Sequence, residues 1–141
     1  MKTLEAANEL FRNDLFATKT TGIAIAAVGE NYAKCVLSVD ARHLNANGVI
    51  MGGAIFTLAD FTFAAASNSE ETNAVSLTSQ ITYLNPGKGS LLKAEAKCLK
   101  CGRRTCSFLI SVTDETGALI AEVTTSGIRM PRKNPVPRSD G

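Results

Sequence analysis

One long segment of this chain carries a single charge. Between Arg42 and Glu70 the only formally charged residue is Asp60, if histidine is taken as neutral. Ala and Leu are frequent from 54 to 68 and no proline interrupts them, so we expect one helix there. Its Phe, Leu and Ala side chains leave no polar face, which predicts a helix buried on all sides.

Shorter segments of β-forming residues lie on both sides of that helix. An apolar stripe at helical spacing predicts a short helix at 3–13. Segments rich in β-forming residues, some with alternating apolar and polar side chains, predict strands at 20–28, 32–39, 74–84, 90–100, 104–113 and 118–129. An antiparallel sheet curved around the long helix would bury it, so the sequence predicts an α+β fold. In this interpretation residues 1–130 form one domain, and the proline-containing segment 131–141 is a flexible tail.

Length and charge exclude several classes of protein. The chain has 141 residues, with 15 Lys and Arg against 13 Asp and Glu, a formal net charge of +2. That balance does not favour a nucleic-acid partner. The sequence has no run of about 18 uncharged apolar residues, so no membrane span is expected. Residues 1–5 lack the basic-then-apolar layout of a signal peptide, and we therefore expect a cytoplasmic protein.

The chain has four cysteines, Cys35, Cys98, Cys101 and Cys106. Cys98 and Cys101 have the spacing of a zinc knuckle, but no second pair of Cys or His residues completes it. In a regular strand, residues three apart point to opposite faces of the sheet. We therefore interpret all four as free thiols and predict neither a metal site nor a cofactor.

Two features of the apolar segment favour a functional site. An ionised Asp60 without partners in a buried helix would cost several kcal/mol or would take up a proton. Gly52 and Gly53 lie where the helix should begin, and the first N–H groups of a helix have no intrahelical partner. Such amides can hold the oxygen of a polarised carbonyl, because glycine lets a ligand approach the backbone closely. The alternatives are an Asp60 that faces solvent or another subunit, and a Gly-Gly pair that only makes a tight turn.

The segment 43–60 resembles the signature of hotdog-fold acyl-CoA thioesterases of the phenylacetate-degradation (PaaI-like) family. That signature is an Asn, then His-Gly-Gly six residues later, then Leu-Ala-Asp. Here it reads Asn45, Met51-Gly52-Gly53 and Leu58-Ala59-Asp60. The resemblance covers about residues 20–130, with further matches at Val75-Ser76, Ile81-Thr82-Tyr83, Asn85-Pro86-Gly87 and Gly102-Arg103. It implies a hotdog fold, in which an antiparallel sheet wraps around one central helix.

The resemblance also implies a reaction and the residues that perform it. The chain would hydrolyse the thioester of a small or medium acyl-CoA. Asp60 would be the general base or the nucleophile, and the Gly52 amide would hold the thioester oxygen. Asn45 would position the water or the thioester, and Ser76 would orient the attacking water. In this family Asn and Gly come from one subunit and Asp and Ser from its partner, which implies a homodimer or a dimer of dimers.

The same resemblance suggests where the substrate would lie. Met51 and Gly53 would border the thioester at the start of the helix. Phe61 is a candidate wall of the apolar slot for the acyl group, with a place in the core as the alternative. Arg103 and Arg104 are candidates for binding the phosphates of coenzyme A, with a solvated charged turn as the alternative.

Met51 departs from the family pattern, because the family has His at this position. Methionine neither donates a hydrogen bond nor transfers a proton. This departure motivates an alternative function, a non-catalytic hotdog protein that binds acyl-CoA. The only histidine, His43, lies eight residues upstream, and we interpret it as a hydrogen-bonding residue of the loop. A hydratase of the same fold would need an Asp/His pair in a different motif, which the chain does not have.

Overall fold

A computed structural model describes residues 2–132 of the chain. The helical elements are α1 (Leu4–Leu10), η1 (Phe16–Thr21), η2 (Ala41–His43) and α2 (Gly52–Ser67). The strands are β1 (Ile23–Gly29), β2 (Tyr32–Ser38), β3 (Thr72–Tyr83), β4 (Leu91–Cys101), β5 (Thr105–Asp114) and β6 (Leu119–Pro131). Strand β6 thus takes in the first residue of the expected tail, 131–141, and the tail from 133 onward lies outside the described residues. Within residues 2–132, no helix has the length and apolar character that a bilayer crossing needs.

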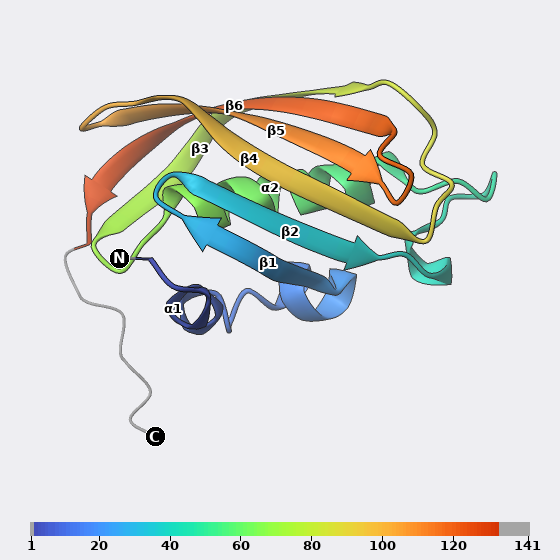
Figure 1. Cartoon of the computed structure of the whole chain (residues 1–141), viewed down its shortest axis with the longest axis horizontal. Coiled ribbons are helices and arrows are strands. Elements are labelled where there is room, and N and C mark those ends of the chain that lie inside the picture. Colours follow the sequence, from blue (N-terminus) through green and yellow to red (C-terminus); the bar gives the residue numbers. More distant parts are fainter. Residues whose placement is uncertain (1, 133–141) are drawn as a thin grey trace.

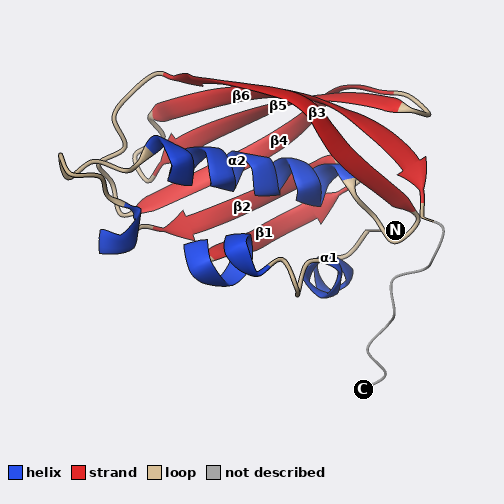
Figure 2. Ribbon diagram, turned by 180° about the vertical axis from the view of Figure 1, so that it is seen from behind, coloured by secondary structure: helices blue, strands red, loops and turns tan. Residues whose placement is uncertain are grey.

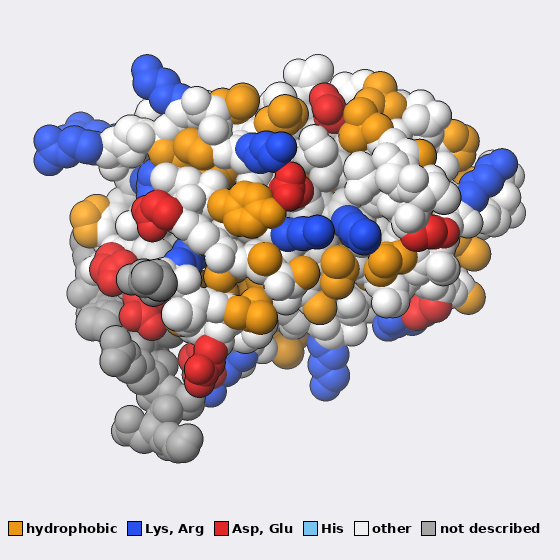
Figure 3. Space-filling view, in the orientation of Figure 1, with side chains coloured by type: hydrophobic (Ala, Val, Ile, Leu, Met, Phe, Trp, Pro, Cys, Tyr) orange, Lys and Arg blue, Asp and Glu red, His pale blue; other side chains and the backbone are white. Residues whose placement is uncertain are grey.

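The six strands form one antiparallel sheet in the order β1-β2-β4-β5-β6-β3. Figures 1 and 2 show that the sheet curves around α2, which lies against one of its faces. This is the α+β architecture that the sequence predicts. Figure 3 shows the face of the sheet away from α2, where acidic and basic side chains are mixed with separate apolar ones.

The core lies between α2 and the inner face of the sheet. On β4, Leu92, Ala94 and Ala96 are fully buried and alternate with less buried residues, as the two-residue period of a strand requires. Leu58 of α2 is fully buried in the same apolar cluster. Because burying one leucine side chain stabilises a protein by about 1.5–3 kcal/mol, this layer fixes the helix on the sheet.

One face of α2 is not covered within the single chain. Gly53 and Asp60 are exposed, and Thr57 and Ala64 are partly exposed. Thr57, Asp60 and Ala64 follow Gly53 by four, seven and eleven residues, so the four side chains form one stripe along the helix. The prediction of a helix buried on all sides is therefore wrong for one chain, because the sheet covers only the opposite face.

Strand β3 is an open edge of the sheet. Among the described residues its ladder partner is β6 alone, and most of its side chains are exposed. Val75 and Leu77 are apolar and are 51% and 62% exposed. An unprotected apolar edge strand is a ready template for pairing with another chain.

A β-bulge in β4 changes the orientation of two cysteines. The register with β5 shifts between Cys98 and Lys100, so that Cys98 lies opposite Phe108 and Cys101 opposite Cys106. This shift places Cys98 and Cys101 on the same face, and the prediction that they point to opposite faces is wrong. Burial, and a hydrogen bond that the protonated Cys101 thiol donates to the neighbouring Cys98, raise the pKa of Cys101 to about 12. All four cysteines are free, as predicted.

Candidate active site

Helix α2 begins at Gly52 with two unbonded amides. Its N-cap residue, Met51, provides no side-chain cap, and the Met51 carbonyl accepts from Ala54 N at 3.0 Å and Ile55 N at 3.3 Å. Within residues 2–132 the N–H groups of Gly52 and Gly53 have no acceptor. Free amides at a helix N-terminus favour a carbonyl oxygen that gains negative charge.

The start of α2 is held from two sides. The Met51 amide donates to the carbonyl oxygen of His43 at 2.8 Å. The Tyr83 hydroxyl, at the end of β3, donates to the carbonyl oxygen of Gly52 at 2.9 Å. A Cβ atom on Gly52 would lie 2.8 Å from the Tyr83 hydroxyl oxygen, so glycine permits this close approach. The separation of 31 residues between Gly52 and Tyr83 gives no signal of this contact in the sequence.

His43 is a buried structural residue of the loop before α2. Its Nδ1 accepts from Asp40 N at 3.0 Å, and its Nε2 lies 2.7 Å from the carbonyl oxygen of Thr21. Since Nδ1 accepts, Nε2 is the ring nitrogen that donates, and the Thr21 carbonyl oxygen is its acceptor. Both ring nitrogens are therefore engaged in the fold, in agreement with the interpretation of His43 as a loop residue.

Asp60 lies on the open face of α2. Its side chain is exposed in the single chain, yet partial burial raises the pKa of its carboxyl, and the nearby Asp14 carboxylate raises it further. Eight residues of helix separate Asp60 from Gly52, which corresponds to about 12 Å along the helix axis. One chain therefore does not bring the carboxylate and the Gly52 amide to the same carbonyl group.

The side chain of Asn45 is used within its own loop. Its Oδ1 accepts from Asn47 N at 2.9 Å and from Val49 N at 3.3 Å. Asn45 is exposed, and among the described residues its side-chain nitrogen has no hydrogen-bond acceptor. The residue thus shapes the loop and keeps a free donor.

Ser76 lies on β3, on the side of the strand that faces α2. It is paired with Gly127 of β6, and residues opposite each other in an antiparallel pair share a face. A Cβ atom on Gly127 would lie 3.1 Å from Cζ of Phe63 in α2, which identifies this face. Ser76 is exposed, and the β-bulge between Ser76 and Thr78 follows it directly.

The predicted substrate contacts fall in different places. Met51 is 58% exposed, and Gly53 has open space where a Cβ would be. Phe61 is only 3% exposed and packs edge-on against Phe11, with ring centroids 5.3 Å apart, so it belongs to the core. Arg103 and Arg104 are exposed in the turn between β4 and β5, which Figure 1 places at the opposite end of α2 from Gly52.

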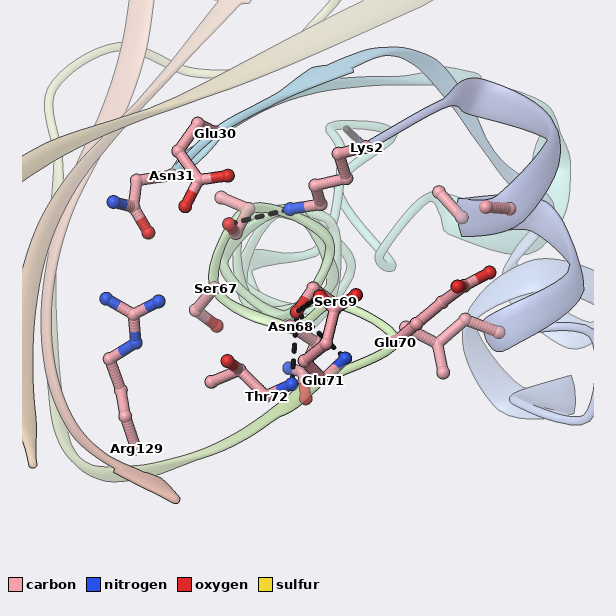
Figure 4. A pocket seen from close by; sticks show the side chains of 14 residues that line it. Lys2, Glu30, Asn31, Ser67, Asn68, Ser69, Glu70, Glu71, Thr72 and Arg129 are labelled. Carbon is pink, nitrogen blue, oxygen red and sulfur yellow. Dashed lines mark hydrogen bonds between the residues drawn. The ribbon is translucent and has the colours of Figure 1, made fainter. Parts of the chain in front are cut away.

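Two hollows border the ends of α2. Beside Gly52 lies an open one of about 450 Å³, lined mainly by apolar residues including Val49, Ile50, Ile55, Leu84 and Pro86. The other, of about 430 Å³, lies at the carboxyl end of α2 (Figure 4). Lys2, Glu30 and Arg129 line it, so it carries charges of both signs. Because Asp60, Gly52 and Gly53 do not line this second hollow, we assign the candidate site to the start and the open face of α2.

Comparison with known proteins identifies the family of the chain. The model of the thioesterase superfamily matches residues 47–121, more than half of the chain. The acyl-coenzyme A thioesterase PaaI of Escherichia coli is 33% identical over 121 residues, which are 85% of this chain and 86% of that protein. A relative from Archaeoglobus fulgidus is 43% identical over 93 residues, which are 65% of this chain and 60% of that protein's length.

Solved structures have the same fold. The structure of the Escherichia coli PaaI protein superimposes with a TM-score of 0.83 at 30% identity and covers 89% of this chain and 91% of its own. A Streptococcus mutans protein, crystallised with acetyl-CoA, superimposes with a TM-score of 0.74 at 27% identity. That match covers 79% of this chain and 91% of the other chain.

Proposed function

Since this chain belongs to the thioesterase superfamily, as a PaaI-like protein with the hotdog fold, we propose that it hydrolyses the thioester of a small or medium acyl-CoA to the free acid and coenzyme A. One observation carries this proposal. The free amides of Gly52 and Gly53 border the open face of α2 that carries Asp60. The names of the relatives point to the same substrate, because the Escherichia coli protein is an acyl-CoA thioesterase and the Streptococcus mutans protein was crystallised with acetyl-CoA.

In the proposed reaction the Asp60 carboxylate takes a proton from water while the water oxygen bonds to the thioester carbon. The carbonyl oxygen becomes an oxyanion, which the Gly52 amide stabilises. The intermediate then breaks its carbon–sulfur bond and releases coenzyme A as a thiolate. A raised pKa suits Asp60 to this task, because a general base works best when its pKa is near the working pH. The alternative role of Asp60 is direct attack on the thioester carbon.

Met51 leaves this mechanism without the family's histidine. A thiol of ordinary pKa near 8.5 can leave as the thiolate at neutral pH, so no protein acid is required at this step. The exposed Met51 beside Gly52 still supports a second candidate function, binding of acyl-CoA without hydrolysis. Tight binding of acyl-CoA with no turnover across a panel of substrates would favour that second function.

The site needs two copies of the chain in this proposal. Because Asp60 and Gly52 of one chain lie about 12 Å apart along the helix, each Asp60 would act on a carbonyl held by the Gly52 amide of the other copy. The open stripe on α2 and the apolar edge of β3 provide the surface for a homodimer, or for a dimer of dimers built from it. In such a pair Asn45 and Gly52 would come from one chain, and Asp60 and Ser76 from the other.

Coenzyme A would extend from this site toward the turn that carries Arg103 and Arg104. In an antiparallel pair of α2 helices, the far end of one helix approaches the start of the other. The two arginines of one copy would then lie beyond the partner's Gly52, by about 10 Å or more, since seven further residues of helix follow Asp60; there their guanidinium groups can bind phosphate. Weakened acyl-CoA binding at high salt is expected, because exposed charges are screened.

A hydrolysis assay with two matched variants tests the reaction. Aliphatic and aryl acyl-CoAs are incubated with the wild type, Asp60→Asn and Asp14→Asn. Coenzyme A release is followed by chromatography, because a thiol reagent would also react with the free cysteines of the chain. We expect Asp60→Asn to lose at least about 100-fold in kcat, and Asp14→Asn to keep the wild-type rate at alkaline pH. An unimpaired Asp60→Asn, or a wild type that hydrolyses no substrate, would contradict the proposal.

A mixing experiment tests the shared site. Gly52→Pro removes the amide proton at the first position of a helix, where proline is tolerated, and Asp60→Asn removes the base. Each variant alone should be inactive. Co-refolded in equal amounts they should recover about a quarter of wild-type activity, since half of the dimers are mixed and each mixed dimer has one intact site. No recovery from a mixture that forms dimers would exclude a site shared in this way.

A further inference from the structure

Only one of the two tyrosines contacts the start of α2. We propose that Tyr83 is a positioning residue for the oxyanion-binding amides, an inference that rests on the proposed thioesterase function. The other tyrosine, Tyr32, donates to the Glu95 carboxylate at 2.7 Å on β2 and β4 and does not contact α2 through its hydroxyl.

Tyr83 is held firmly at its base. It pairs with Ala121 of β6, and directly after it the Leu84 amide donates to the carbonyl oxygen of Ile120 at 2.8 Å. The Asn85 side chain adds a hydrogen bond of 2.7 Å to the carbonyl oxygen of Leu119. The end of β3 is therefore fixed to the sheet, and the tyrosine ring extends from it to the helix.

The hydroxyl meets the backbone at a peptide group that matters for the site. The Gly52 carbonyl, which accepts from Tyr83 at 2.9 Å, belongs to the same peptide group as the free N–H of Gly53. A hydrogen bond to that carbonyl fixes the plane of the group and polarises its N–H, which makes it a better donor. On the other side of Gly52, the Met51 amide donates to the carbonyl oxygen of His43 at 2.8 Å. The Gly52 amide therefore lies between two backbone groups that are both fixed by hydrogen bonds, the Met51 N–H and the Gly52 carbonyl.

The geometry distinguishes positioning from direct catalysis. The Tyr83 proton is already directed at the Gly52 oxygen, so this hydroxyl does not supply a proton to a leaving group. Tyr83 also lines the hollow of about 450 Å³ beside Gly52, but a ring without the hydroxyl would line it equally well. The role that needs the hydroxyl is orientation of the backbone.

Tyr83→Phe tests this role, with Tyr32→Phe as the matched control. We expect Tyr83→Phe to lower kcat about fivefold to tenfold with KM changed less than about twofold, because the lost hydrogen bond acts on the transition state. Tyr32→Phe should keep both constants. A wild-type kcat in Tyr83→Phe, or an effect confined to KM, would overturn the inference.

A double-mutant cycle adds a measurement that a general loss of structure would not reproduce. Gly52→Ala places a Cβ 2.8 Å from the Tyr83 hydroxyl oxygen and so displaces it. Tyr83→Phe should then reduce kcat no further in the Gly52→Ala background, since the contact is already broken. Independent, multiplicative losses would place the action of Tyr83 elsewhere and overturn the inference.

The same assay separates this inference from the proposed function. If the wild type turns over acyl-CoA, Asp60→Asn does not, and Tyr83→Phe equals the wild type, the positioning role alone is overturned. If the wild type releases no coenzyme A, the proposed function fails and this inference fails with it.

Discussion

The Nε2 atom of His43 lies 2.7 Å from the carbonyl oxygen of Thr21, and this contact joins the loop before α2 to the end of η1. The His43 ring is buried, and its other nitrogen accepts from the Asp40 amide at 3.0 Å. The carbonyl oxygen of His43 accepts a hydrogen bond from the Met51 amide. One histidine thus connects three segments that lead to the candidate site.

His43→Ala is expected to lower the free energy of unfolding by about 2–4 kcal/mol, because it leaves the buried Thr21 carbonyl and the partly buried Asp40 amide without partners. Urea denaturation measures the change. Asn47→Ala, at an exposed position of the same loop, is the control and should be nearly neutral. Equal stability of the two variants would show that the ring contacts contribute nothing.

Asp14→Asn should move the acidic limb of the kcat/KM profile to lower pH. Burial is the main cause of the raised pKa of Asp60, and the Asp14 carboxylate adds to it. Removing that negative charge lowers the pKa of Asp60, so the base ionises at lower pH while the plateau at higher pH is unchanged. A profile that stays in place or moves to higher pH would contradict a coupling between the two carboxylates.

Asp60→Asn is expected to stabilise the fold at neutral pH while it abolishes activity. The pKa of Asp60 is higher in the folded chain than in the unfolded chain. Between those two values the folded state binds more protons, so the wild type loses stability as pH rises through that range. Thermal unfolding at neutral and at strongly acidic pH should show a gain for Asp60→Asn that disappears in acid. Glu122→Gln, at a carboxylate of β6, serves as the control for a general loss of negative charge.

Most of the fold follows from local patterns in the sequence. The six strands begin and end within three residues of the predicted limits, because the alternation of side chains is regular and the turns are short. The π-helix η1 is missed, since Phe16–Thr21 has no apolar period and contains three threonines. Gly22, with a φ of +89°, ends this element and separates it from β1, which begins three residues later than the predicted strand at 20–28.

The candidate site is predicted only in part. Gly52 and Asp60 stand out because a glycine pair and a lone acid break an apolar segment. The contact between Tyr83 and Gly52 is set by the packing of β3 against the start of α2, so no local pattern contains it. The bulge beside Cys98 is likewise a property of strand pairing, which alternation in one strand does not show.

Gly127→Ala is expected to destabilise the protein by about 1–3 kcal/mol through overpacking. The added Cβ would lie 2.7 Å from the carbonyl oxygen of Val75 and 3.1 Å from the ring of Phe63. The first of these atoms is backbone on the neighbouring strand, so it has little room to move. Gly29→Ala, where the nearest atoms would be at 3.8 Å, is the control. Urea denaturation of both variants should show a loss at Gly127 alone, and an equal effect at both sites would contradict the steric argument.

The Lys2 ammonium caps the carboxyl end of α2 and should make stability depend on pH in the alkaline range. Its Nζ donates to the carbonyl oxygen of Ala66 at 2.8 Å, and burial lowers the pKa of Lys2 from 10.5 to about 8. Between those two values the unfolded chain holds the proton and the folded chain does not, so stability increases with pH. The neutral amine can still donate to Ala66, so the cap is kept.

Relative to Lys2→Met, the wild type should therefore gain free energy of unfolding from neutral pH to about pH 10, as measured by urea denaturation. Lys88→Met, at an exposed lysine, is the control, and parallel pH curves for the wild type and Lys2→Met would show that Lys2 is not buried as described.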